Sequence, residues 1–162
     1  MDLVELITLR QELADDCRVL RESAARSARH VAAEHDGRLE AAAFDLARCY
    51  NIIEQMALRV ARGFENHVDK DRGWHEALLR RLILEIPGIR PAFFPADLRP
   101  ALDESRRFRH LVHHAYDLSL REDRIRELTG IAQSLAARLP ESCEAFVRQV
   151  AKLNDWTLPA PG

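Results

Sequence analysis

Apolar residues recur every three or four positions along almost the whole chain, which is the period of an amphipathic α-helix. The clearest stripe covers residues 39–64, about seven helical turns. An earlier stripe begins at residue 3 and ends near residues 36–37, and a shorter one covers residues 74–86, just before Pro87. No segment shows the two-residue alternation of a half-buried strand. The pattern therefore predicts helices and no β-sheet.

The second half of the chain has the same period, with clearer start and stop signals. Residues 86–95 contain three prolines and two phenylalanines, and they predict an ordered loop. A helix is expected from about Asp97, and the capping-box spacing of Ser119 and Glu122 predicts the start of another. Because proline has no N–H for the interior of a helix, Pro140 is expected to interrupt that helix before a last one begins.

The composition favours long helices. The 162 residues include only six glycines and seven prolines, and 47% are hydrophobic against 31% charged, an ordinary balance for a globular protein. We predict an all-α fold, an antiparallel helical bundle of four long helices plus one or two short helices. Residues 1–158 are expected to form a single domain, followed by a short tail at residues 159–162.

Charge, cysteines and the N-terminus narrow the possible functions. The formal net charge is −2, so any nucleic-acid site must be a local patch rather than a global basic field. Cys17, Cys49 and Cys143 lie far apart and are interpreted as small buried hydrophobes in a reducing compartment. The acidic N-terminus lacks the pattern of a signal peptide, and no stretch approaches the roughly 20 apolar residues of a membrane span. A cytoplasmic protein without membrane contact is expected.

Residues 105–117, which we name the motif segment, differ from the rest of the chain. Nine consecutive positions within it hold three arginines and three histidines. On a helix that turns about 100° per residue, with Phe108 at the centre of the buried face, these side chains divide between two flanks. One flank has Arg109, His113 and Tyr116, and the opposite flank has Arg107, His110 and His114. The motif segment is therefore expected to border the core.

Arginine and histidine together are the side chains that metal-free RNA cleavage requires. Arginine offers a permanent positive fork for phosphate oxygens, and histidine accepts or donates a proton near neutral pH. We interpret Arg109 as the residue that binds phosphate and stabilises its growing charge, and His114 as the general base or acid. Arg106 and Arg107 are expected to bind RNA. No metal and no cofactor is expected.

The spacing within the motif segment leaves the identity of the base open. On an ideal helix Arg109 and His114 lie about 140° apart, so one straight helix does not aim both at one phosphate. Either the helix is distorted near the motif, or two subunits contribute across a two-fold axis. His113, four residues after Arg109, is better placed on a straight helix and is the rival base, with His110 in a supporting role.

The same residues resemble those of a known family. Arg109-x4-His114-x-Tyr116 is similar to the Arg-x4-His-x-Tyr motif of the HepT ribonuclease toxins, within the HEPN superfamily. Further similar features occur between about residues 40 and 135: Gly63-Phe64-Glu65-Asn66, Trp74-His75 with Leu78-Leu79, Arg90-Pro91, and Arg106-Arg107-Phe108-Arg109-His110. Many members have Asn or Asp after the motif arginine, where this chain has His110.

The resemblance implies a metal-independent endoribonuclease toxin of a toxin–antitoxin system. It implies a HEPN-like homodimer in which Arg and His from both subunits meet in one cleft. It also implies a nucleotidyltransferase antitoxin as partner, which in some systems attaches AMP to the motif tyrosine, here Tyr116.

Several alternatives remain open. HEPN bundles also serve as non-catalytic binding modules that partner a nucleotidyltransferase, and fold alone does not separate the two functions. In a helical scaffold without a ligand, the motif segment would be only a solvated or interface-lining face. His110 and His114 have the spacing of a zinc pair, but no third ligand follows them. His75, at the start of its helix, is interpreted as structural.

Overall fold

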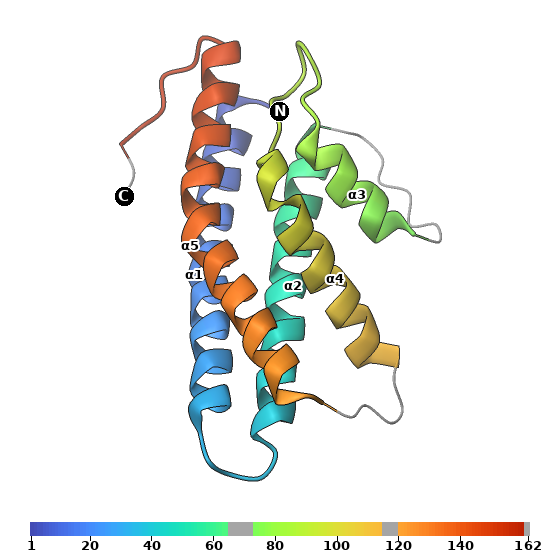
Figure 1. Cartoon of the computed structure of the whole chain (residues 1–162). Coiled ribbons are helices and arrows are strands. Elements are labelled where there is room, and N and C mark those ends of the chain that lie inside the picture. The colour runs from blue at the N-terminus through green and yellow to red at the C-terminus, as the bar shows by residue number, and fades with distance from the viewer. Residues whose placement is uncertain (65–72, 115–119, 161–162) are drawn as a thin grey trace.

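The computed structural model describes residues 1–64, 73–114 and 120–160, without the side chain of His114. This part of the chain forms α1 (Leu3–Ala32), α2 (Arg38–Phe64), α3 (Trp74–Ile83), the 3₁₀-helix η1 (Ala96–Leu98), α4 (Arg99–His114) and α5 (Glu122–Leu153) (Figure 1). Among the described residues no β-strand occurs, and a single isolated bridge joins Ile86 and Arg90. None of the described helices is both long enough and apolar enough to cross a membrane. The predicted all-α bundle is confirmed.

Three long helices form the body of the bundle. Figure 1 shows α1, α2 and α5 side by side, with α3 and α4 together against α2. The apolar stripes meet between these helices, where the fully buried side chains include Leu6, Leu20, Ile53, Met56 and Phe146. Burying each such side chain contributes about 1.5–3 kcal/mol. The stripes that predicted the helices are therefore also the core.

α5 is one continuous helix, although it contains Pro140. The predicted interruption at that residue is wrong. Leu139 and Cys143 on either side of the proline are buried, and burial of this kind offsets the roughly 3 kcal/mol that proline costs inside a helix. Figure 1 shows α5 bending along its length, as helices with an internal proline do. α5 begins at Glu122, later than the capping-box pattern predicts, and Ser119 itself lies outside the described residues.

The loop after α3 is ordered around one arginine. α3 ends at Ile83, earlier than predicted, because the backbone becomes extended at Leu84. Arg90 is fully buried, and its guanidinium donates hydrogen bonds to the carbonyl oxygens of Leu84 at 2.9 Å and Arg81 at 3.1 Å. The last carbonyls of a helix lack helical partners and favour a positive charge. Arg90 therefore fixes the C-terminal end of α3.

α4 places the motif segment at the side of the bundle. It begins at Arg99 after η1, close to the predicted start at Asp97. Leu102 and Phe108 are buried, whereas Leu111, which the apolar period assigns to the same face, is 49% exposed. Figure 1 shows the C-terminal end of α4 leading away from α2. The start of α4 therefore belongs to the core, and its end lies at the surface.

Candidate active site

Arg109 of the motif segment lies towards α2. Its side chain is half-buried, and its Nε donates a hydrogen bond to Oδ1 of Asn51 at 3.0 Å. Its terminal nitrogens, Nη1 and Nη2, make no hydrogen bond to any residue that the structure describes. Because the guanidinium is held through one nitrogen, it keeps donors for two oxygens of a phosphate group.

Arg106 and Arg107 lie on different sides of α4. Arg106 lies towards α3, where its Nη2 is 3.4 Å from a carboxylate oxygen of Glu76. Arg107 is 67% exposed, and its Nη1 is 3.9 Å from Glu104. Arg107 lies on the side of α4 that faces α5, where it lines a groove. The division of arginines between two flanks, predicted from the helical period, therefore holds for Arg107 and Arg109.

The histidines of the motif segment are described only in part. His110 and His113 are exposed on α4. The backbone of His114 ends α4, but its side chain and the whole of Tyr116 lie outside the described residues. α4 remains α-helical through His114, which removes a helix break as the explanation for the angle between Arg109 and His114. The choice of base and the alternative zinc pair both stay predictions.

Arg106 and Arg109 meet polar side chains from two neighbouring helices. Direct contacts join Arg109 to Asn51, 58 positions away in the sequence, and Glu54 to His75. We name the whole group the polar cluster: Tyr50, Asn51 and Glu54 of α2, His75 of α3, and Arg106 and Arg109 of α4. The packing of α3 and α4 against α2 therefore gathers groups that the sequence separates.

Glu54 and His75 form a carboxylate–imidazole pair within the polar cluster. Glu54 is only 6% exposed, and a buried carboxylate is unfavourable unless a partner compensates its charge. Nδ1 of His75 contacts Oε1 of Glu54. In the neutral imidazole, Nδ1 then donates to the carboxylate and Nε2 is the basic nitrogen. The Trp74 ring lies against the imidazole at a centroid distance of 3.9 Å, and the His75 side chain remains 30% exposed.

The Tyr50 hydroxyl lies among the charges of the polar cluster. Tyr50 is 1% exposed. Burial raises its pKa well above the ordinary value, and the negative charge of Glu54 raises it further, while the positive charges of Arg106 and Arg109 oppose this shift. The phenol is therefore neutral at physiological pH.

The polar cluster combines groups that can bind an anion with a group that can transfer a proton. Arg106 and Arg109 supply permanent positive charge, and Nε2 of His75 accepts or donates a proton. Asn51 accepts a hydrogen bond from Nε of Arg109, and Glu54 contacts the imidazole of His75. This arrangement suits a phosphate group at which a proton must move.

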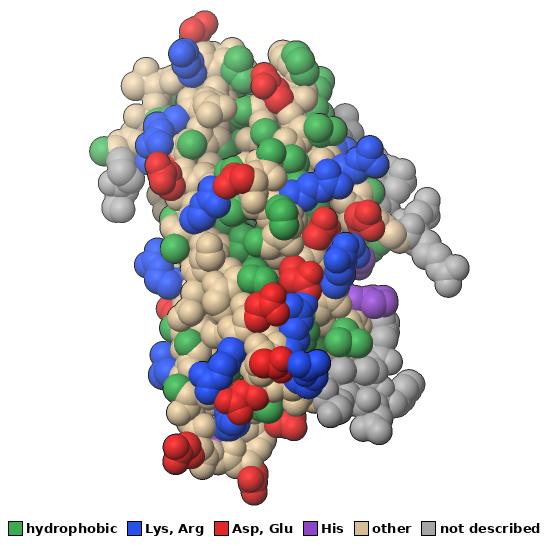
Figure 2. All heavy atoms as spheres, viewed as in Figure 1, with side chains coloured by type: hydrophobic (Ala, Val, Ile, Leu, Met, Phe, Trp, Pro, Cys, Tyr) green, Lys and Arg blue, Asp and Glu red, His purple; other side chains and the backbone are tan. Residues whose placement is uncertain are grey.

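A groove lies between α4 and α5, beside the opposite flank of the motif segment. Its volume is about 420 Å³, and it is lined by Phe108, Leu111, Leu120, Ile125, Glu104, Arg107, Arg121 and Arg124. Figure 2 shows basic and acidic side chains interspersed on the face that α4 and α5 present. Positive charge on this face is therefore local, in keeping with the net charge of −2.

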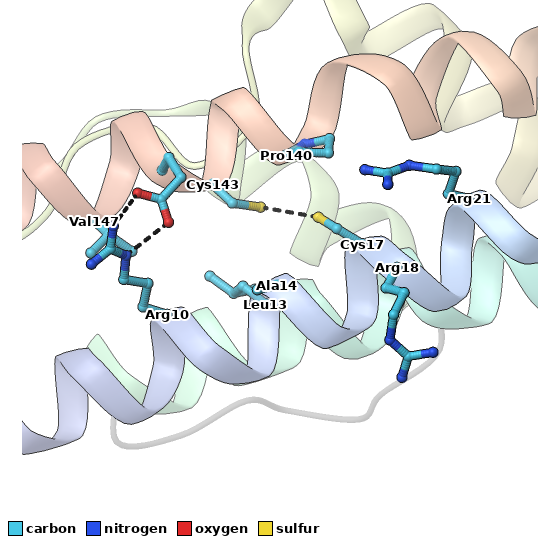
Figure 3. Close-up of a pocket in the computed structure, with 10 residues that line it drawn as sticks. Arg10, Leu13, Ala14, Cys17, Arg18, Arg21, Pro140, Cys143 and Val147 are labelled. Carbon is cyan, nitrogen blue, oxygen red and sulfur yellow. Dashed lines mark hydrogen bonds and ion pairs between the residues drawn. The ribbon is translucent and has the colours of Figure 1, made fainter. Parts of the chain in front are cut away.

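Another cavity, between α1 and α5, belongs to the structural contacts of the bundle. It measures about 310 Å³, and no described residue of the motif segment or polar cluster lines it (Figure 3). Arg10 donates two hydrogen bonds of 2.8 Å to the carboxylate of Glu144. The three cysteines are buried, as predicted, but the sulfur atoms of Cys17 and Cys143 lie 3.9 Å apart, which their spacing did not predict. These polar groups join α1 to α5.

Comparison with known protein families shows to which family the chain belongs. The HepT-like protein family matches residues 41–150, a span that contains the motif segment and the polar cluster. The chain belongs to the HepT-like family. The predicted resemblance of the chain to the HepT proteins of the HEPN superfamily is thereby confirmed. Searches among curated proteins and among solved structures gave no match for this HepT-like protein.

Sequence reasoning missed Glu54 and gave His75 a structural role. A signal for Glu54 was present, because it lies four residues after Tyr50, beside the apolar stripe of α2, where an acid requires a partner. No pattern identified His75 as that partner, because the contact joins two helices across 21 positions.

Proposed function

We propose that this HepT-like protein is a metal-independent endoribonuclease toxin that acts in the cytoplasm. The observation that supports this best is the gathering of Glu54, Arg106 and Arg109 around the Tyr50 hydroxyl, with His75 bound to Glu54, in a HepT-like protein that has the Arg-x4-His-x-Tyr motif. Phosphate-binding and proton-transferring groups at one place are what RNA transphosphorylation requires.

The proposed reaction is attack by a 2′-hydroxyl on the adjacent phosphate. Arg109 binds the phosphate and stabilises the charge that grows on its oxygens. His114 gives or takes a proton, with His110 and His113 in support, while Arg106 and Arg107 hold the RNA backbone. RNA is the substrate because DNA lacks the attacking hydroxyl.

A homodimer completes this site. Within one uninterrupted helix, Arg109 and His114 are separated by about 140°, so His114 of one copy is proposed to act with Arg109 of the second. A two-fold axis near α4 brings both motif segments together. The exposed Leu111 and the groove between α4 and α5 supply apolar surface for this contact.

A nucleotidyltransferase antitoxin is the proposed partner, with AMP attached to Tyr116 as the means of silencing. The AMP phosphodiester would add a negative charge to the motif segment, and this charge could pair with Arg109 or Arg106. Co-expression with such a transferase should add the mass of one AMP at Tyr116, and AMP on a different residue would overturn the assignment.

A non-catalytic binding module is the second candidate. Two carboxylates favour this function: Glu76 beside Arg106, and Glu104 beside Arg107. They partly neutralise the positive charge that RNA binding would require. RNA cleavage by the purified protein separates the ribonuclease from the binding module.

The test is RNA cleavage by the purified protein in EDTA. The wild type should cut RNA and leave DNA intact, and Arg109→Ala should lose at least about 100-fold in rate because one phosphate-stabilising group is gone. Arg18→Ala is the matched control, since Arg18 is an exposed arginine of α1 paired with Glu22, and it should cut normally. Equal rates for Arg109→Ala and wild type would count against the proposed site.

A further inference from the structure

His75 has surroundings that suit proton transfer better than packing. Its Nδ1 is occupied by the buried carboxylate of Glu54, and the Trp74 ring covers the imidazole. The side chain nevertheless keeps 30% of its surface exposed. This exposure gives a substrate access to the imidazole. In this arrangement Nε2 is the basic nitrogen.

Both arginines of the polar cluster lie, like Glu54, close enough to the Tyr50 hydroxyl for their charges to act on it. Arg106 pairs at 3.4 Å with Glu76, the residue that follows His75 on α3. Arg109 is held by Asn51, three residues before Glu54 on α2, and side chains at that spacing are neighbours on one helix face. A phosphate bound by these guanidinium groups would therefore lie beside His75.

We propose that His75 is a catalytic residue of the ribonuclease site and that Glu54 positions it. This assignment rests on the proposed function. Nε2 of His75 accepts the proton of the RNA 2′-hydroxyl while the 2′-oxygen forms its bond to phosphorus. The negative charge of Glu54 stabilises the imidazolium that results.

A histidine of the motif segment completes the proposed reaction. The bond between phosphorus and the 5′-oxygen breaks as that oxygen receives a proton from a histidine of the motif segment. The products are a 2′,3′-cyclic phosphate and a free 5′-hydroxyl. His75 then returns its proton to water.

The decisive variant is His75→Asn. The asparagine amide takes the place of Nδ1 and still donates a hydrogen bond to Glu54, but it transfers no proton at neutral pH. We expect single-turnover cleavage to fall by about 100-fold or more. RNA affinity and the melting temperature should stay near the wild-type values.

His30→Gln is the matched control, because the glutamine amide takes the place of Nε2. Nε2 of His30 lies 3.6 Å from the buried carboxylate of Asp45, which makes this pair a structural counterpart of His75 and Glu54. Asp45 precedes Glu54 by nine positions on α2, so the two carboxylates lie about 180° apart around that helix. This variant should cut RNA at the wild-type rate.

The outcomes separate this assignment from the proposed function. If the wild type cuts RNA and His75→Asn cuts equally fast, the assignment is wrong and the proposed function stands. If the wild type leaves RNA intact, both are wrong. If His75→Asn lowers the melting temperature, His75→Ala with added imidazole decides: restored cleavage supports the catalytic role, and cleavage that imidazole does not restore contradicts it.

Discussion

Three arginines of α4, within four positions of one another, have quite different surroundings. Arg107 is largely exposed, Arg106 is 22% exposed beside Glu76, and Arg109 is held by Asn51. A turn of about 100° per residue explains why neighbours in sequence point in different directions. The period predicts the flanks, but it does not reveal which helix lies opposite each flank.

Replacement of His114 and of His113 should have different effects on cleavage. His114 has the spacing of the HepT motif, so His114→Ala should lower the rate by about 10²–10⁴-fold, the range for loss of a general acid or base. His113→Ala should stay active, and circular dichroism should show both variants folded. An inactive His113→Ala beside an active His114→Ala would make His113 the proton-transfer residue.

In α5, tertiary packing outweighs the local rule that a proline ends a helix. Proline inside a helix predicts an interruption, yet α5 continues through Pro140 because the residues around it are buried against α1 and α2. The remaining helices could be predicted because each has its own apolar period. The polar cluster could not, because it depends on contacts between helices far apart in the sequence, such as Arg109 with Asn51, which no periodic pattern encodes.

The ion pair between Arg10 and Glu144 should make the packing of α1 on α5 sensitive to acid. The hydrogen bonds from Arg10 lower the pKa of Glu144. The pair therefore stabilises the fold fully above the ordinary glutamate value of about 4.3, and this contribution is lost as pH falls through the lowered value. Glu144→Gln should cost about 1 kcal/mol or less in urea unfolding at pH 7.

The acid range provides the check on this ion pair. The difference in unfolding free energy between wild type and Glu144→Gln should shrink from pH 5 to pH 3. Glu22→Gln, in the exposed pair with Arg18, should change stability little at either pH. A difference that stays constant down to pH 3 would contradict the role given to Arg10.

At the scale of the whole molecule, the expected state is a dimer through α4. Light scattering should give twice the 18.5 kDa mass of one chain. Leu111→Asp should reduce the mass to that of one chain and abolish cleavage, because a charge in an apolar contact costs association energy, while the helical signal persists. An active protein of 18.5 kDa at working concentration would refute the shared site.

Metal-independent transphosphorylation is tested with one RNA prepared with and without a 2′-hydroxyl at the cut position. Both substrates are incubated with the wild-type protein in EDTA, and the new 3′ ends are identified by mass. Transphosphorylation predicts cleavage of the all-ribose RNA to a 2′,3′-cyclic phosphate and no cut at the 2′-deoxy position. Cleavage at the 2′-deoxy position, or cleavage only after a divalent metal is added, would contradict it.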